Sequence, residues 1–264
     1  MKAKILSFLL AAASSFAQAK SPRGFQRVTL QVDNVAREAL VYAPAAAKEK
    51  PAPLVFVFHG HGGGMLQAAH SFSMHTHWPE AISVYPQGLP TPGKLTDPEG
   101  KRAGWQNSAG DQNDRDLKFF DALLAKLKQD YKVDDTRLYS TGHSNGGAFT
   151  YLLWSERGAQ FAAFAPSAAV MRKMDGLKPK PAMHLAGEKD TLVKYQWQEL
   201  MMLAVRKLNG CDAAGKTRGE RATLYPAKTG TPVVTYIHPG GHEFPRDAVP
   251  LVVKFFKEHP LAAK

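Results

Sequence analysis

Hydrophobic residues along the chain form short continuous runs that alternate with longer stretches of helical periodicity. Residues 54–58 are continuously apolar, which predicts a central strand that is covered on both faces. Residues 117–131 place their apolar side chains along one face of an amphipathic helix. We expect further strands at residues 27–32, 39–42, 81–85, 137–141, 161–165, 182–186 and 233–237, and further helices after residue 144 and at residues 197–208 and 249–257. This alternation predicts an α/β fold with a mainly parallel central sheet and helices on both faces.

The first 19 residues have the pattern of a secretory signal peptide. Lys2 and Lys4 precede an apolar stretch, and Ala17-Gln18-Ala19 is a small-x-small cleavage site. The apolar stretch is too short to span a membrane. We therefore expect cleavage after Ala19, a secreted or periplasmic protein without integral membrane association, and one domain at residues 20–264.

The composition, 44% hydrophobic and 22% charged, is typical of a globular protein. The formal net charge is +11, but the Lys and Arg residues are scattered and form no basic run with interleaved aromatic residues. Nucleic-acid binding is therefore not expected. Cys211 is the only cysteine, which excludes a disulfide within the chain.

The turn at residues 142–147 has the sequence GHSNGG, which contains a Gly-x-Ser-x-Gly motif. A predicted strand precedes it and a predicted helix follows it. This context is typical of a nucleophilic serine whose hydroxyl is exposed above a sheet. The motif alone also fits a simple turn that starts a helix, because short motifs recur by chance.

A nucleophilic serine needs a base and a carboxylate, and with this motif they follow in the order Ser, Asp or Glu, His. Asp190 lies just beyond one predicted strand, and His242 lies on a glycine-rich loop beyond the last strand. We expect His242 to deprotonate Ser144 and Asp190 to orient His242. Glu188 and His238 are the local competitors for these two roles.

An acyl-transfer site also needs N–H donors for the oxyanion. One expected donor is the backbone N–H of Asn145, the residue after the serine. The sequence HGHGGG at residues 59–64 follows the central strand, and we expect His61 or Gly62 to supply the second donor. His59 is expected to be a hydrogen-bonded core residue. A phosphate-binding loop is the alternative, but the spacing of the glycines does not fit one.

Several motifs occur in a fixed order along most of the chain. They are HGHGGG, YPQG at residues 85–88, WQN at 105–107, an acidic run at 111–116, GHSNGG, GEKD at 187–190 and GGHEFP at 240–245. In this order they resemble the secreted polyhydroxybutyrate depolymerase and feruloyl esterase-like family of α/β-hydrolases. The resemblance implies an α/β-hydrolase fold without a large lid and ester hydrolysis without a cofactor. It makes Ser144 the nucleophile, Asp190 the acid and His242 the base.

No metal site is expected from the sequence. His70, His75 and His77 have no carboxylate or cysteine at a useful spacing, so a partly packed helix explains them better. The acidic run at residues 111–116 lacks the glycine and the distal glutamate of a calcium loop. Helix capping and a favourable charge at a helix N-terminus are its expected roles.

Aromatic residues near the expected site are candidates to line an acyl pocket, although a single aromatic residue is more often part of the core. They are Trp105, Tyr195, Trp197 and Phe244. We expect a serine-dependent esterase that acts on feruloyl or acetyl esters of polysaccharide, or on hydroxyalkanoate oligomers and polyesters. A serine peptidase of the same fold and a catalytically dead binding protein are the alternatives.

Overall fold

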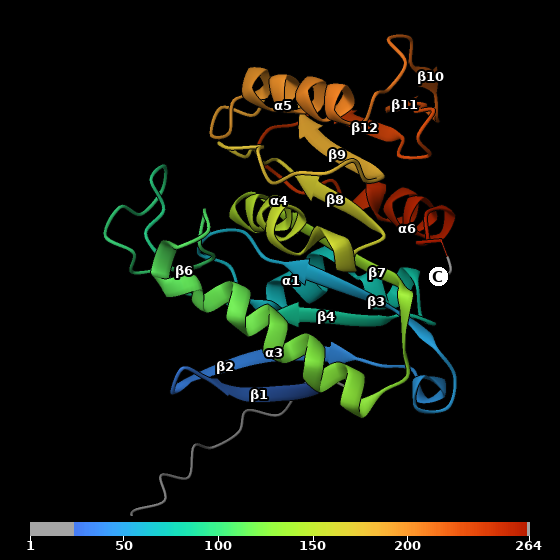
Figure 1. Ribbon diagram of the computed structural model, residues 1–264. Coiled ribbons are helices and arrows are strands. Elements are labelled where there is room, and N and C mark those ends of the chain that lie inside the picture. The colour runs from blue at the N-terminus through green and yellow to red at the C-terminus, as the bar shows by residue number, and fades with distance from the viewer. Residues whose placement is uncertain (1–23, 263–264) are drawn as a thin grey trace, which may run out of the picture.

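The computed structural model describes residues 24–262, which form one large sheet with helices on both faces (Figure 1). The expected signal peptide at residues 1–19 lies outside the described residues. In chain order, the strands of this sheet are β1 (Gln26–Val32), β2 (Val35–Tyr42), β3 (Ala52–Phe58), β4 (Ile82–Pro86), β7 (Val133–His143), β8 (Ala163–Ser167), β9 (Ala182–Gly187), β10 (Lys216–Thr217), β11 (Ala222–Tyr225) and β12 (Val233–His238).

The sheet order is β1-β2-β4-β3-β7-β8-β9-β12-β11-β10. The strands from β4 to β12 in this order run parallel to one another, whereas the strands outside them form antiparallel pairs at both edges. The mainly parallel sheet predicted from the sequence is therefore confirmed, with β10 and β11 as an unexpected addition. Two short strands, β5 (Leu89–Pro90) and β6 (Ala103–Gly104), form a separate antiparallel ladder.

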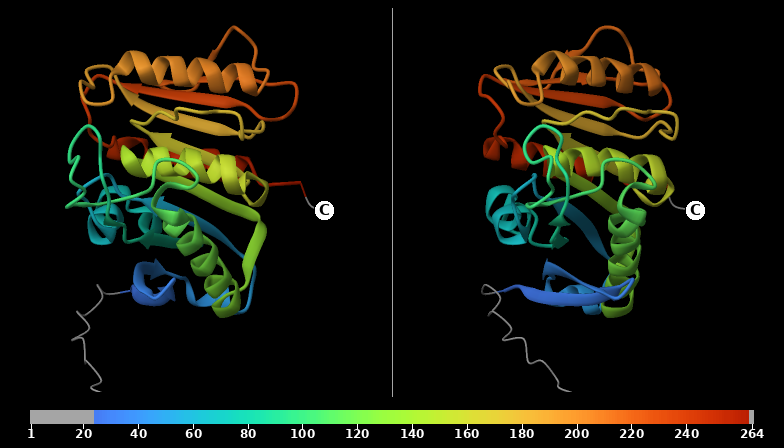
Figure 2. Two further views of the ribbon diagram at one scale, coloured as in Figure 1. Left: turned by 60° about the vertical axis from the view of Figure 1, so that its left-hand side comes forward. Right: turned by 90° about the vertical axis from the view of Figure 1, so that its left-hand side faces the viewer.

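Helices cover both faces of the sheet, so the molecule has three layers (Figure 2). One face is covered by α3 (Arg115–Asp130), α4 (Asn145–Arg157) and α5 (Tyr195–Leu208), and the other by α1 (Met65–Phe72), α2 (Met74–His77) and α6 (Val249–Glu258). Four short 3₁₀ turns occupy Ala45–Lys48, Asp111–Asp114, Gly158–Gln160 and Arg246–Ala248. No large lid domain is inserted among residues 24–262.

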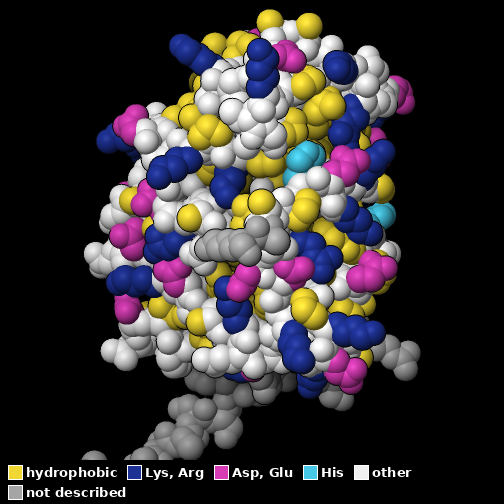
Figure 3. Space-filling view, turned by 45° about the vertical axis from the view of Figure 1, so that its right-hand side comes forward, with side chains coloured by type: hydrophobic (Ala, Val, Ile, Leu, Met, Phe, Trp, Pro, Cys, Tyr) yellow, Lys and Arg dark blue, Asp and Glu magenta, His cyan; other side chains and the backbone are white. Residues whose placement is uncertain are grey.

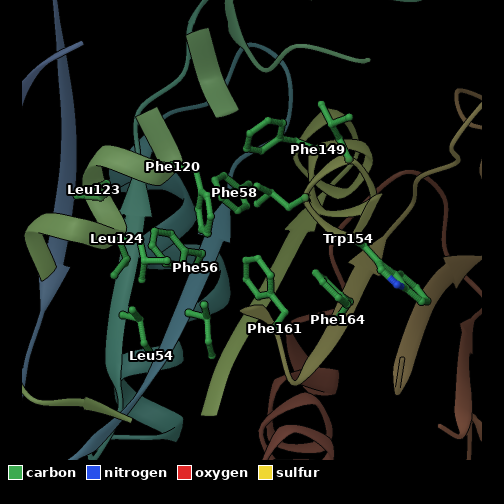
Figure 4. Close-up of a cluster of buried hydrophobic side chains, with 14 of the residues drawn as sticks. Leu54, Phe56, Phe58, Phe120, Leu123, Leu124, Phe149, Trp154, Phe161 and Phe164 are labelled. Atoms are coloured by element: carbon green, nitrogen blue, oxygen red, sulfur yellow. The ribbon is translucent and has the colours of Figure 1, made fainter. Parts of the chain in front are cut away.

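The central strand β3 is buried on both faces, as its continuous apolar sequence predicts. Phe56 and Phe58 point toward α3 and α4, where they meet Phe120 and Phe149 (Figure 4). The alternate side chains of β3 belong to the cluster on the opposite face, because successive residues of a strand point to opposite sides. Each of these fully buried side chains contributes roughly 1.5–3 kcal/mol to folding.

The parallel strands bring the candidate residues to one edge of the sheet. Strands β3, β7, β9 and β12 have parallel neighbours, with Phe58 opposite Gly142 and Gly187 opposite His238. Their carboxyl ends therefore lie at the same edge, where ligands of open α/β sheets bind. The loops after these four strands carry the HGHGGG, GHSNGG, GEKD and GGHEFP motifs.

The charged side chains of the surface are mixed. On the face shown in Figure 3, Lys and Arg side chains are interspersed with Asp and Glu side chains. Within residues 24–262, none of the helices has both the length and the apolar character that crossing a membrane requires.

Candidate active site

Ser144 lies in a sharp turn between β7 and α4. Its backbone has φ 57° and ψ −122°, an unfavourable conformation for a residue with a side chain, and its N–H donates to the Ser167 carbonyl oxygen at 2.8 Å. Glycine is required at two neighbouring positions. A Cβ at Gly146 would lie 2.3 Å from the Phe58 carbonyl oxygen, and one at Gly142 would lie 2.4 Å from the Gly146 oxygen. The two glycines therefore let the helix start directly against β3.

The structure brings Ser144, His242 and Asp190 into one line of hydrogen bonds. His242 Nε2 lies 2.8 Å from Ser144 Oγ, and His242 Nδ1 lies 2.7 Å from Asp190 Oδ2. An ionised carboxylate only accepts, so Nδ1 carries the imidazole proton and donates it to Asp190. Nε2 is then free to accept a hydrogen bond from the serine hydroxyl.

Asp190 is buried and accepts four hydrogen bonds. Oδ1 accepts from the backbone N–H groups of Leu192 and Val193, each at 2.9 Å. Oδ2 accepts from Gln198 Nε2 at 3.0 Å in addition to His242. The two backbone donors therefore orient the carboxylate independently of the imidazole. Gln198 is not among the site residues predicted from the sequence, because a polar residue in an amphipathic helix gives no sign of facing inward.

The two local competitors are separate from this line of hydrogen bonds. Glu188 is exposed on the loop after β9. His238 is the last residue of β12, where its Nδ1 accepts the Gly240 N–H at 3.3 Å. Burial lowers the pKa of His238, although the carboxylate of Glu243, 3.9 Å away, opposes this shift.

The candidate oxyanion donors differ in their availability. Asn145 is the first residue of α4, so its N–H has no acceptor within the helix. The N–H of Gly62 donates to the Ala103 carbonyl oxygen at 2.7 Å, so the prediction of Gly62 as a donor is wrong. No acceptor among residues 24–262 contacts the N–H of His61, so of the two predicted donors in this loop His61 is the available one.

The side chains of the two histidines in the HGHGGG loop make hydrogen bonds that stabilise the loops around the site. The His59 ring is buried and donates from Nδ1 to the Gly60 oxygen, while Nε2 accepts the Gly88 N–H. Burial lowers the pKa of His59 to about 4, so this ring is neutral at neutral pH. His61 donates from Nε2 to the Thr91 oxygen at 2.8 Å and accepts the Thr96 hydroxyl at Nδ1 at 3.0 Å.

The side chain of Asn145 anchors the segment that follows β6. Its Oδ1 accepts the Trp105 N–H at 2.6 Å, and its Nδ2 donates to the Trp105 oxygen at 3.0 Å. The segment from β5 to Trp105 is therefore bonded both to the residue after Ser144 and to the ring of His61.

A second histidine packs against His242. The rings of His143 and His242 lie 4.9 Å apart, and His143 Nδ1 lies 3.2 Å from Ser167 Oγ. Burial, and then repulsion by a charged His242, lower the pKa of His143 to about 3. His143 therefore adds no positive charge beside His242 at neutral pH.

The four aromatic candidates occupy different environments. Trp105 is fully buried against Phe58 and Phe149, so it is a core residue and its expected place in a pocket wall is wrong. Phe244 is half-buried, stacks on Phe72 at 3.8 Å and lies 6.2 Å from the His143 ring. Tyr195 and Trp197 lie in the first turn of α5, just after the loop of Asp190.

Two of the three histidines of α1 and α2 have separate side-chain partners. His70 Nε2 lies 3.3 Å from an Arg246 nitrogen, and His75 bonds the Tyr85 hydroxyl at 3.0 Å. In the part of the chain that the structure describes, no three His, Cys, Asp or Glu side chains gather as metal ligands.

The acidic run at residues 111–116 makes no capping hydrogen bond to α3, so the expectation of capping is wrong, whereas Asp116 does lie in the first turn of the helix, where a negative charge is favourable. Asp114 accepts Gln106 Nε2 and the Gly110 N–H, both at 2.8 Å, and makes no capping hydrogen bond to the helix. Asp116 is buried, pairs with Arg37 at 2.7 Å and accepts the Gln106 N–H. These carboxylates stabilise the loop before α3, because they accept hydrogen bonds from Arg37, Gln106 and Gly110 and not from the N–H groups of the helix.

The chain is similar in sequence to known esterases. The chain is 28% identical over 207 residues to the probable feruloyl esterase C of Aspergillus clavatus, a match that covers 76% of this chain and 71% of that protein. It is also 28% identical over 199 residues to the bifunctional acetylxylan esterase/xylanase XynS20E of Neocallimastix patriciarum, covering 72% of this chain and only 26% of that longer protein.

The solved structures similar to this chain share its fold. A ferulic acid esterase matches with a TM-score of 0.63 and 15% identity, over 89% of this chain and 97% of that structure. No protein-family model matches the chain. The chain therefore has the α/β-hydrolase fold and is similar in sequence to feruloyl and acetylxylan esterases.

Proposed function

We propose that the protein is a serine-dependent carboxylic-ester hydrolase that works through an acyl-enzyme. The observation that carries this proposal is the line of hydrogen bonds from Ser144 through His242 to Asp190. Three side chains from distant parts of the chain meet there with the donor and acceptor order that nucleophilic catalysis needs.

The first half of the reaction forms the acyl-enzyme. Ser144 Oγ attacks the ester carbonyl carbon while His242 Nε2 accepts the hydroxyl proton, and Asp190 stabilises the resulting imidazolium. The negative charge on the carbonyl oxygen is stabilised by the N–H groups of Asn145 and His61. The tetrahedral intermediate then collapses. Its bond to the alcohol oxygen breaks, and His242 donates its proton to that oxygen.

The second half of the reaction releases the acid. A water molecule gives its proton to His242 Nε2 and attacks the acyl carbon, which restores the oxyanion. When this intermediate collapses, the bond to Ser144 Oγ breaks and His242 returns the proton to the serine. The carboxylic acid leaves, and the enzyme is regenerated without a cofactor.

The substrates that we propose are feruloyl or acetyl esters of polysaccharide. The names of the curated relatives support this choice. Phe244, stacked on Phe72 beside the His143 ring, offers an apolar surface that suits an aromatic or short acyl group. Hydroxyalkanoate oligomers and polyesters are the second substrate class, which the order of the sequence motifs supports.

We also propose that the protein is exported and that residues 20–264 form its single catalytic domain. The basic residues, apolar stretch and Ala17-Gln18-Ala19 site of the first 19 residues support export. N-terminal sequencing of protein recovered from the periplasm or the medium should begin at Lys20. A sequence that begins at Met1 or Lys2 would contradict cleavage.

The decisive experiment is replacement of Ser144 by alanine, with Ser155→Ala as the matched control. Ser155 lies further along α4, and its hydroxyl bonds Glu156. We expect Ser144→Ala to remain folded and to lose the hydrolysis of short p-nitrophenyl esters, whereas Ser155→Ala stays active. Equal turnover by both variants would remove Ser144 from its proposed role.

A substrate panel tests the proposed substrate classes. Methyl ferulate, acetylated xylan, hydroxybutyrate oligomers and a peptide amide are compared by kcat/KM. We expect methyl ferulate or acetylated xylan to give the highest values and the amide to give none. Preferred cleavage of the hydroxybutyrate oligomers would move the assignment to the second class, and preferred cleavage of the amide would contradict an esterase.

A further inference from the structure

A line of buried polar side chains extends from Asp190 into the core. Gln198 of α5 donates from Nε2 to Asp190 Oδ2 at 3.0 Å, and its Oε1 lies 3.4 Å from Nε2 of His184 in β9. His184 Nδ1 lies 2.8 Å from the hydroxyl of Tyr151 in α4. The exposed fractions of Gln198, His184 and Tyr151 are 0%, 2% and 1%.

The partners of Gln198 fix which way its amide points. Its nitrogen lies near two acceptors, Asp190 Oδ2 and the Val193 carbonyl oxygen at 2.7 Å, so Nε2 must face them. Its oxygen therefore faces His184 and accepts the proton that His184 carries on Nε2.

The ring of His184 is fixed in the same way. Because Nε2 donates to Gln198, Nδ1 is the acceptor of the Tyr151 hydroxyl. Burial lowers the pKa of His184 to about 4, so the ring is neutral and keeps this tautomer at neutral pH. Every hydrogen bond of the line thus points toward the carboxylate of Asp190.

We propose that Gln198 is a positioning residue of the active site, whose amide is held by His184 and Tyr151 and holds Asp190 Oδ2 in line with His242. This inference rests on the proposed esterase function. A reversed amide would place its oxygen against the carboxylate oxygen, which two acceptors without a proton cannot share. The two residues behind Gln198 therefore prevent the arrangement that would turn Asp190 away from the imidazole.

Gln198 also affects the charge that His242 experiences. His143 interacts electrostatically with Asp190 and His242, and His238 interacts with Asp190. Burial lowers the pKa of both histidines. Glu243 is the carboxylate beside His238, at 3.9 Å. Because those rings are neutral, the N–H groups that donate hydrogen bonds to Asp190 are the main positive dipoles that oppose its negative charge. Removing Gln198 would leave that charge less compensated and would stabilise the protonated imidazole.

The test replaces Gln198 by methionine, which keeps the length of the side chain and removes its donors. We expect kcat on p-nitrophenyl acetate to fall roughly 10–100-fold, because a hydrogen bond to a charged group is lost. KM should change less than about twofold, because the groups that bind the ester are untouched. The acid limb of the kcat/KM profile should move to higher pH.

Asn209→Leu is the matched control for a purely structural role. Asn209 follows the last residue of α5, is as buried as Gln198, and donates to the Lys180 and Thr231 oxygens at 2.7 and 2.8 Å. Both variants should lower Tm, but Asn209→Leu should leave kcat and the acid limb unchanged. If both variants change the kinetics alike, or neither does, Gln198 has no positioning role.

Two further variants cover other outcomes. Should Gln198→Met fail to fold, Gln198→Glu adds a second carboxyl beside Asp190 and should move the acid limb upward; an unmoved limb would overturn the inference. Tyr151→Phe should lose less kcat than Gln198→Met, because its contact is two side chains away from Asp190. If Ser144→Ala still hydrolyses esters, the proposed function is rejected, and Gln198 then has no serine-dependent reaction to support.

Discussion

Asp190→Asn tests the proposed mechanism most directly, because both carboxylate oxygens face donors. Oδ1 accepts two backbone N–H groups, whereas Oδ2 accepts from Gln198 Nε2 and His242 Nδ1. Asparagine has only one acceptor oxygen. The backbone donors cannot turn away, so that oxygen should occupy the Oδ1 position, and the NH₂ group should then meet the two donors at Oδ2.

The size of the effect follows from the response of the imidazole. His242 relieves the clash of donors when its proton moves to Nε2 and Nδ1 becomes an acceptor. A protonated Nε2 cannot accept the proton of Ser144, and no carboxylate remains to stabilise an imidazolium. We expect kcat to fall about 10⁴-fold, which corresponds to about 5 kcal/mol of transition-state stabilisation.

Hydrolysis of p-nitrophenyl acetate measures this effect, with thermal unfolding to show that the variant is folded. Glu188→Gln is the matched control, because Glu188 is an exposed carboxylate on the same loop. It should keep the kcat of the unmodified enzyme. A folded Asp190→Asn variant that retains more than about a tenth of kcat would refute the assigned role, as would an equal loss in the control.

Three further predictions concern stability. Gly146→Ala should lower Tm sharply or prevent soluble expression, because its Cβ would lie 2.3 Å from the Phe58 oxygen; an unchanged Tm in scanning fluorimetry would contradict this. Asp116→Asn should cost about 3–5 kcal/mol in urea unfolding, because it leaves Arg37 buried without its partner; a cost below about 1 kcal/mol would show that the pair does not stabilise the fold. The free energy of unfolding should fall by up to about 4 kcal/mol per pH unit as pH decreases from about 6.5 to 4. His59, His143 and His184, whose pKa values are lowered from 6.5 to about 4, 3 and 4 in the fold, take up protons only when the chain unfolds. Urea titrations at pH 7, 6 and 5 measure this loss, and equal values would contradict it.

The sequence predicts the sheet and the meeting of Ser144, Asp190 and His242 because both depend on local patterns. Apolar runs mark the strands, and candidate residues directly after parallel strands must reach the same edge. The edge strands β10 and β11 are not predicted in this way, because both are short, β10 is exposed and β11 is only partly buried.

Most of the wrong predictions depend on partners far away in the chain. The Gly62 N–H is already hydrogen-bonded to the Ala103 oxygen, and Trp105 packs in the core against Phe58 and Phe149. Asp116 meets Arg37 across 79 residues. Periodicity and motif spacing carry no information on such contacts, which depend on how the elements pack.

The two uses of His61 link the neighbouring loop to catalysis. Its backbone N–H is the proposed oxyanion donor, whereas its ring holds the Thr91–Thr96 part of the neighbouring loop. An engineer who grafts a loop without a hydroxyl at position 96 would remove one of the two ring partners and weaken the hold on the peptide that carries the donor. Exchanging the loop alone should therefore reduce turnover on every ester, and a successful graft requires a compatible residue at position 61.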